Sequence, residues 1–345
     1  MNQKQIVKGA VLVTLADRNY LEQAKQVFAS AYFNAGWKGD YLLLAHEIPE
    51  KDLQWFRQKG VLIYHCQRIF NPKIAGAHPA ILSKLYLFED YFKKWQTIIY
   101  YDADVIIRSS LDFLIGLKGF VSVNNVNNDR LSREIISLKR ASLRGINKNL
   151  YLNLKKELSI KYHLDNVVFG AGMMVFNSAL INKNLRENLK NLISKYGPIG
   201  DNVDQFILNL YFYHRWQKLP PVYDIYLMQN KNQWRLKNAK IKGIVLHFCG
   251  SEKPWLRNHY FYREWQTNLT KADLVNLANI PKGKTWSRSE IKIYSFYLKV
   301  REKFFNLFLT TAFYFRVMFF VERNFPFFFR LLKKTKRILK DSFNF

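Results

Sequence analysis

The sequence predicts an α/β protein in which helices flank a mostly parallel sheet, followed by a basic, aromatic helical segment. Over the first 125 residues, short apolar β-prone runs alternate with longer amphipathic stretches, the pattern of βαβ units. After about residue 289 the composition changes abruptly, which separates the C-terminal segment from the rest. A chain of 345 residues, 49% of them hydrophobic, can bury a substantial core, so wholesale disorder is excluded.

The expected elements follow one another in a regular order. Strands are predicted where apolar, β-branched runs are bounded by turn residues, at residues 9–16, 41–46, 61–65, 97–101, 120–123, 167–176 and 243–248. Helices are predicted for the amphipathic stretches at residues 20–35, 49–59, 79–94 and 179–196. Residues 124–164 are polar and basic, with helical stretches but no strand signal, and we interpret them as an insertion over one face of the sheet.

Basic residues outnumber acidic ones by a wide margin. The 54 Lys and Arg residues against 26 Asp and Glu residues leave a net charge of +28, which predicts an anionic partner. Nucleic acid, a phosphorylated ligand and an acidic membrane all meet that requirement.

Two cysteines, Cys66 and Cys249, are too few for a disulfide framework, and residues 1–10 lack the apolar run of a signal peptide, so we expect an intracellular protein.

Two carboxylates directly follow the apolar run at residues 97–101. In an open parallel sheet, ligands bind at the carboxyl ends of the strands, which is where Asp102 and Asp104 are expected. With only Ala103 between them, both can reach one hard cation from a turn, as Mg²⁺ or Mn²⁺ bound to a nucleotide diphosphate requires. Asp is also common in turns, so this pair needs support from elsewhere in the chain.

Support comes from the segment that follows the last predicted strand. His247 can supply a nitrogen ligand, Gly250 lets the backbone approach a phosphate, and Lys253 adds a positive charge. A lone histidine beside a strand is more often structural than a ligand. The combination with the carboxylate pair is what favours a metal and phosphate site.

Together these residues resemble glycosyltransferase family 8, over about residues 11–255. The motifs occur in the family's order: the VTLADRNY run at residues 13–20, SKL at 83–85, the Asp-x-Asp pair, FGAGMMVFN at 169–177, Asp204-Gln205 with Asn209, and the closing HxxGxxKPW block at 247–255. The resemblance implies a Rossmann-like nucleotide-sugar transferase domain of the GT-A type, which we expect to span residues 1–270.

The resemblance also implies roles for particular side chains. Tyr20 would stack on uracil, Lys84 would lie near the donor diphosphate and sugar, and Gly250 and Lys253 would hold the β-phosphate. The metal ligands would be Asp102, Asp104 and His247, with Mn²⁺ as the expected cation and Mg²⁺ as an alternative. The residues nearest the anomeric carbon, and hence the catalytic candidates, would be Asp204 and Gln205. The remaining residues expected to contact the donor are Leu15, Ala16, Asp17, Asn19, Ala103, Gly170, Ala171 and Gly172.

This chain departs from the family pattern at two places. Gly170 stands where the family has an Asn that contacts the donor sugar, and Asn124 or Asn125 stands where it has an Asp. UDP-galactose and UDP-glucose are the expected donors, and Gly170 is expected to leave room for the larger substituent of an N-acetylhexosamine. The family retains anomeric configuration, either through a covalent intermediate or through same-face attack, and the sequence leaves both open.

The segment at residues 290–345 is predicted to be a helical membrane anchor, joined to the domain by a linker at 271–289. It holds 17 Phe or Tyr, 12 Lys or Arg and 4 acidic residues, and arginines recur every seven positions at 316, 323, 330 and 337. Aromatic residues at the acyl boundary with basic residues on anionic headgroups are typical of an interfacial helix. A helix pair packed on the domain is the alternative, and a transmembrane helix is disfavoured because Arg316 would lie near its centre.

These observations lead to one hypothesis with two alternatives. We expect a cytoplasmic, peripheral membrane enzyme on the inner face of the membrane that moves a hexose from a UDP-sugar to a lipid-linked saccharide, such as lipooligosaccharide or lipopolysaccharide core. The alternative acceptor is a capsule precursor or a protein. A basic nucleic-acid-binding protein is the non-enzymatic alternative, but no recognised nucleic-acid motif accompanies the charge, so no nucleic acid is expected as a partner.

Overall fold

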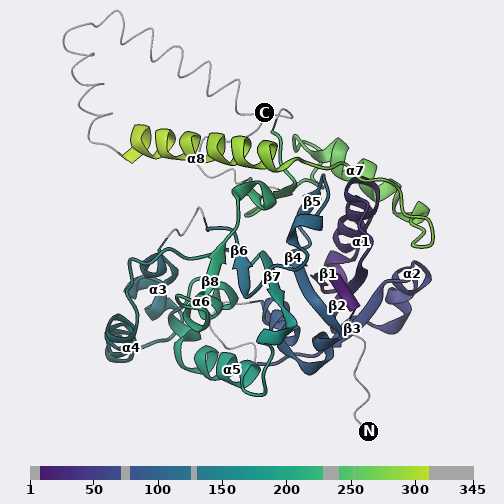
Figure 1. Ribbon diagram of the computed structural model, residues 1–345. Helices are drawn as coiled ribbons and strands as arrows, with labels where there is room; N and C mark the ends of the chain where they lie inside the picture. The colour runs from purple at the N-terminus through teal and green to yellow at the C-terminus, as the bar shows by residue number, and fades with distance from the viewer. Residues whose placement is uncertain (1–7, 71–77, 126–129, 228–240, 252, 311–345) are drawn as a thin grey trace, which may run out of the picture.

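The fold is an α/β architecture built on two sheets (Figure 1). The computed structural model describes residues 8–70, 78–125, 130–227, 241–251 and 253–310. The larger sheet has the strand order β3-β2-β1-β4-β7-β6-β8, and the smaller one has the order β5-β10-β9. The strands are β1 (Lys8–Ala16), β2 (Asp40–His46), β3 (Leu62–Cys66), β4 (Trp95–Tyr101), β5 (Val105–Ile107), β6 (Phe120–Ser122), β7 (Met173–Asn177), β8 (Trp216–Lys218), β9 (Ile225–Tyr226) and β10 (Val245–His247).

The larger sheet is mostly parallel, as predicted. Strands β3, β2, β1 and β4 run parallel to one another, while β7 is antiparallel to both β4 and β6. Strand β8 is parallel to β6 at the edge. Because β1 and β4 lie side by side and run in the same direction, the residues that follow them meet at one edge of the sheet.

Helices cover the sheet on both faces. The α-helices are α1 (Leu21–Ser30), α2 (Gln54–Gln58), α3 (Leu138–Leu143), α4 (Lys148–Lys161), α5 (Leu185–Tyr196), α6 (Val203–Tyr211), α7 (Tyr262–Thr270) and α8 (Arg288–Thr310). In Figure 1, α1 and α7 lie together on one side of the molecule, and α3, α4, α5 and α6 lie on the other.

Strand β1 shows how the two hydrophobic cores arise. Leu12 and Ala16 belong to the core that contains α1, whereas Val11 and Val13 belong to the core that contains α5 and α6. Successive side chains of a strand point to opposite faces, so a continuous apolar run is required when both faces are covered. That is the pattern from which the buried strand was predicted.

The stretch at residues 79–94 is helical, as predicted, but in 3-10 rather than α-helical form. It forms two 3-10 helices, Pro79–Phe88 and Asp90–Lys94, separated by Glu89 in an extended conformation with ψ of 158°. Seven of the ten residues of the first 3-10 helix are buried, so packing on nearly all sides, rather than one amphipathic face, determines its conformation.

Several strands are shorter than predicted, and others carry no sequence signal. Of the strand expected at residues 167–176, only β7 is regular, while Val167 and Phe169 form isolated bridges to Arg130 and Asn124. Strands β5, β8 and β9 have two or three residues each, too few for a periodic pattern. The described part of the insertion at 124–164 is helical in α3 and α4, as expected.

Helix α8 packs on the domain with one side and exposes apolar residues on the other. Ile291 and Leu298 are buried in the core that contains α1, while Ile293 and Phe296 are each 70% exposed. Among the described residues, no helix is both long enough and apolar enough to cross a membrane. The predicted arginine repeat at 316–337 lies outside the described residues, and the division into domain, linker and tail stays a prediction.

Candidate metal and donor site

The candidate metal ligands lie where the two sheets meet. Strand β4 ends at Tyr101, the turn through Asp102 and Asp104 follows, and β5 begins the smaller sheet at Val105. His247 ends β10, which pairs antiparallel with β5 so that His247 lies opposite Val105. This pairing, with the Phe248 N–H donating to the Asp104 carbonyl at 2.9 Å, brings the histidine beside the carboxylate pair.

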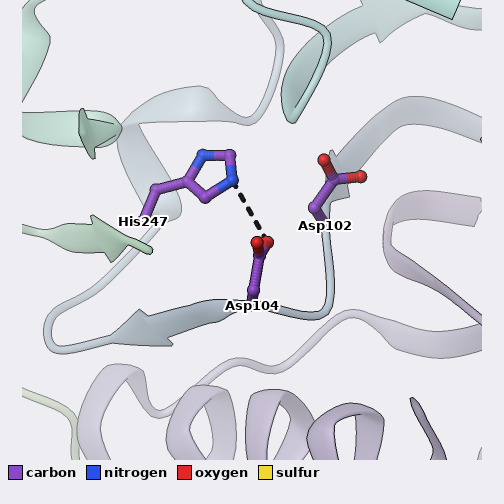
Figure 2. Close-up of side chains that lie close together, drawn as sticks. All are labelled: Asp102, Asp104 and His247. Carbon is purple, nitrogen blue, oxygen red and sulfur yellow. Dashed lines mark ion pairs between the residues drawn. The ribbon is translucent and has the colours of Figure 1, made fainter. Parts of the chain in front are cut away.

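Asp102, Asp104 and His247 form a candidate ligand set for a metal ion. One ligand atom from each lies within 4.8 Å of those of the other two, and Figure 2 shows the three side chains converging. The His247 Nε2 atom is 3.1 Å from Asp104 Oδ1. Two carboxylates and an imidazole suit Mn²⁺, and a hard cation such as Mg²⁺ accepts the oxygens.

Two further features prepare this set for a cation. The buried carboxylate of Asp224 lies 3.0 Å from His247 Nδ1, which leaves Nε2 directed at Asp104. A Cβ atom at Gly172 would lie 2.2 Å from the Cε1 atom of His247 and 2.9 Å from Asp102 Oδ2. The absence of a side chain at Gly172 therefore keeps the space between the ligands open, and the residues fit a bound cation.

Lys84 contacts both Asp102, a candidate metal ligand, and Asp204. Its ammonium is 3.0 Å from Asp102 Oδ1 and 2.7 Å from Asp204 Oδ2, and it donates to the Ala171 carbonyl at 3.2 Å. Burial disfavours the charged form, but the two carboxylates outweigh it and raise the pKa of Lys84 above its usual 10.5. Asp204 lies in the first turn of α6, and its carboxylate binds Lys84 rather than capping the helix.

Gln205 is held by hydrogen bonds at both ends of its carboxamide. Its Oε1 atom accepts from the Ala171 N–H at 3.2 Å, and its Nε2 atom donates to Glu134 Oε1 at 2.6 Å. Glu134 comes from the insertion, is fully buried, and also accepts from Asn125 Nδ2 at 3.2 Å. The insertion therefore fixes the orientation of Gln205.

Lys253, the lysine expected to bind phosphate, contacts one of the candidate metal ligands. The ammonium of Lys253 donates to Asp104 Oδ2 at 2.5 Å and to the Phe248 carbonyl at 2.6 Å. Burial alone raises the pKa of Asp104, but His247 and Lys253 outweigh that effect and hold it well below the usual 3.8. Gly250 has a φ of +89°, a left-handed conformation that favours glycine.

The expected uridine contacts lie at the end of the neighbouring strand. Leu15 and Ala16 end β1, and Asp17 accepts from the Asn19 N–H at 2.9 Å, capping a short 3-10 helix. Tyr20 is 37% exposed and meets Trp255 edge to face at 5.9 Å between ring centroids. Because β1 and β4 are parallel neighbours, these residues lie at the same edge of the sheet as Asp102 and Ala103.

The expectation that Gly170 leaves room for a larger sugar substituent is wrong. A Cβ atom at this position would lie 1.6 Å from the hydroxyl oxygen of Tyr226, so the phenol already occupies that space.

Sequence reasoning missed Tyr226 together with Tyr100, Glu134 and Asp224. Tyr100 donates to Asp102 Oδ1 at 2.5 Å. None of the four belongs to a motif; the Tyr-Asp-Ile-Tyr run at 223–226, between a Pro-Pro pair and the last predicted strand, is the one local hint.

Comparison with known proteins points to one family. The model of glycosyl transferase family 8 matches residues 11–259. GlyA of Streptococcus pneumoniae is 21% identical over 265 residues, covering 73% of this chain and 33% of that protein. The lipopolysaccharide 1,2-glucosyltransferase of Escherichia coli is 25% identical over 250 residues, covering 65% of this chain and 63% of that enzyme. The chain thus spans about a third of GlyA and slightly less than two thirds of the E. coli enzyme.

Solved structures share the fold at low sequence identity. Galactosyltransferase LgtC, in complex with donor and acceptor sugar analogues, superposes with a TM-score of 0.53 at 16% identity, covering 79% of this chain and 98% of LgtC. The bifunctional glycosyltransferase WbbM gives a TM-score of 0.53 at 17% identity, covering 85% of this chain and 52% of WbbM. At these identities the likeness establishes the fold.

Replacing Asp224 tests the metal site without any assumption about the reaction. Asp224→Asn removes the charge behind His247, so Mn²⁺ affinity should fall by about 10- to 100-fold, the usual effect of losing such a partner. Titration followed by the EPR signal of free Mn²⁺ measures it. Asp90→Asn, at a side chain that is 79% exposed, is the matched control. Equal Mn²⁺ affinity in the two variants would contradict a metal site at Asp102, Asp104 and His247.

Proposed function

Because the chain belongs to glycosyltransferase family 8 and is therefore a glycosyltransferase, we propose that it transfers a hexose from a UDP-sugar, with retention of anomeric configuration and with a divalent cation, Mn²⁺ or Mg²⁺. The observation that carries this proposal is the convergence of Asp102, Asp104 and His247 beside the ion pair between Lys84 and Asp204. Asp102 directly follows β4 of the larger sheet, whereas His247 ends β10 of the smaller sheet, so their meeting is a property of the fold.

The charges of the site suit the departure of a nucleoside diphosphate. When the anomeric C–O bond breaks, negative charge grows on the β-phosphate and positive charge on the sugar. A cation held by Asp102, Asp104 and His247 would supply Lewis-acid stabilisation of that leaving group. Lys253 adds positive charge at the same place, since its ammonium contacts Asp104.

Asp204 and Gln205 are the residues we place nearest the anomeric carbon. Lys84 keeps the Asp204 carboxylate in place through a 2.7 Å ion pair. Glu134 and the Ala171 N–H fix the Gln205 carboxamide, so its oxygen and nitrogen cannot exchange places freely. Such an arrangement provides preorganised polar groups on the sugar side of the site. Both retaining routes, through a covalent intermediate or by same-face attack, remain consistent with it.

For the acceptor, we propose a lipid-linked saccharide such as the core of lipooligosaccharide or lipopolysaccharide. The name of the E. coli relative supports this choice, as does the net charge of +28, which suits a phosphorylated acceptor on an anionic membrane. A capsule precursor or a protein is the alternative acceptor. The enzyme would then act at the cytoplasmic face, as a peripheral protein.

The exposed side of α8 supports association with a membrane surface. Ile293, Phe296, Tyr297 and Val300 are spaced at i, i+3, i+4 and i+7, and they are 70%, 70%, 48% and 46% exposed. They lie opposite Ile291 and Leu298, which pack on the domain. We propose that this side enters the acyl boundary while neighbouring basic residues contact anionic headgroups.

Release of UDP from a panel of UDP-sugars tests the proposed reaction. With Mn²⁺ present, one UDP-hexose should be hydrolysed, and Asp104→Asn should lower the rate by at least about 100-fold, because the leaving group loses its principal stabilisation. Asp90→Asn should retain the wild-type rate. If the wild-type protein neither releases UDP nor binds it in a Mn²⁺-dependent manner, the proposal fails.

Charged substitutions on α8 test the membrane surface. Ile293→Glu combined with Phe296→Glu should weaken binding to vesicles of anionic phospholipid by at least about tenfold, because burying one large apolar side chain contributes about 1.5 to 3 kcal/mol. Co-sedimentation measures binding, and UDP release should be unchanged. Leu274→Glu, at a residue that is 68% exposed outside α8, is the control. Equal vesicle binding by all variants would refute the proposal that this side of α8 binds the membrane.

A further inference from the structure

Gly170 and Tyr226 share one space inside the site. A Cβ atom at residue 170 would lie 1.6 Å from the Tyr226 hydroxyl oxygen and 2.8 Å from its Cζ atom. Gly170 does not have the left-handed φ that favours glycine, so its backbone would accept other residues. The phenol of Tyr226 is therefore what excludes a side chain at residue 170.

Gly170 and its neighbours are held firmly beside the groups that carry the chemistry. The Gly170 N–H donates to the Val123 carbonyl at 3.1 Å, and the Gly170 carbonyl accepts from Ser122 Oγ at 3.0 Å. The next residue, Ala171, donates its N–H to Gln205 and accepts from Lys84. At Gly172, a side chain would collide with the imidazole of His247. The segment 170–172 thus lies beside the candidate metal ligands Asp102 and His247 and beside Gln205, a catalytic candidate.

Tyr226 approaches this segment from the smaller sheet. It ends β9 directly opposite His247 in the parallel pairing of β9 with β10, and its ring centroid is 5.1 Å from that of the imidazole. Its phenolic hydroxyl can both donate and accept a hydrogen bond.

We infer that Tyr226 is a specificity-determining residue for the transferred sugar. Its hydroxyl stands where a side chain of residue 170 would begin, at the segment 170–172 that borders the candidate metal ligands and Gln205. There it hydrogen-bonds a polar substituent of the hexose, while the ring excludes a bulkier one such as an N-acetyl group. This inference rests on the proposed function, because it concerns the donor of that same site.

Tyr226→Phe separates the hydroxyl from the ring. In full-length protein with Mn²⁺, kcat/KM for UDP release is measured with UDP-glucose, UDP-galactose and the two UDP-N-acetylhexosamines, and the affinity for UDP itself is measured by competition. The ratio between the preferred hexose donor and the next one should fall by about tenfold, the effect of one lost hydrogen bond to substrate, with UDP affinity within twofold of wild type. Tyr223→Phe, the same change at a buried neighbouring tyrosine, should leave the ratio unchanged.

The outcomes distinguish this inference from the proposed function. If the wild-type protein binds UDP and discriminates among donors but Tyr226→Phe keeps the same ratio, the inference alone is overturned. An equal decrease in UDP affinity and in kcat/KM for every UDP-sugar would also overturn the inference, because such a result would indicate a merely structural role for Tyr226. If the wild-type protein binds no UDP, the proposed function fails and the inference fails with it.

The shared space has its own test, which needs no activity. Gly170→Ala should lower the melting temperature in the presence of Tyr226, whereas adding Gly170→Ala to Tyr226→Ala should cost much less. Thermal unfolding of the four proteins gives this coupling. Additive effects would contradict the steric relation on which the inference rests.

Discussion

The balance of charge at the junction of the two sheets is the constraint on which the rest of the structure depends. Four carboxylates gather there: Asp102, Asp104, Asp204 and Asp224. Left unpaired and largely buried, such groups would repel one another and lose hydration. Lys84 joins Asp102 to Asp204, while Lys253 and His247 neutralise Asp104. Removing Lys84 would leave its partners uncompensated, at a cost of about 3 to 5 kcal/mol.

Satisfying this balance brings together elements that lie far apart in the sequence. The turn through Asp102 and Asp104 carries the chain from β4 in the larger sheet to β5 in the smaller one. Pairing of β5 with β10 then places His247, and the buried 3-10 helix places Lys84, which is only 4% exposed. The same contacts that stabilise the fold therefore hold positive groups and acids ready for a cation and a diphosphate, which is why site and fold are difficult to change separately.

Much of this arrangement could be predicted from the sequence, because local patterns encode it. The alternation of apolar runs predicted the α/β fold, and the Asp-x-Asp pair with His247 predicted a candidate ligand set whose three side chains the structure brings together. Asp224, Glu134 and Tyr226 could not be predicted, since each acts through long-range pairing: Glu134 meets Gln205 across 71 positions and Asp224 meets His247 across 23. The helix predicted at residues 79–94 is present, but the sequence pattern did not distinguish its 3-10 geometry, which accompanies burial on nearly all sides.

We propose that Asp102, Asp104 and His247 hold a divalent cation in contact with the donor diphosphate. Pulsed EPR of the protein with Mn²⁺ and UDP tests it most directly, because the metal reports the nuclei bound to it. We predict couplings to one imidazole nitrogen and to phosphorus, with the nitrogen coupling lost and the phosphorus coupling kept in His247→Gln. Bound Mn²⁺ that shows no phosphorus coupling, or that keeps the nitrogen coupling in His247→Gln, would contradict the account.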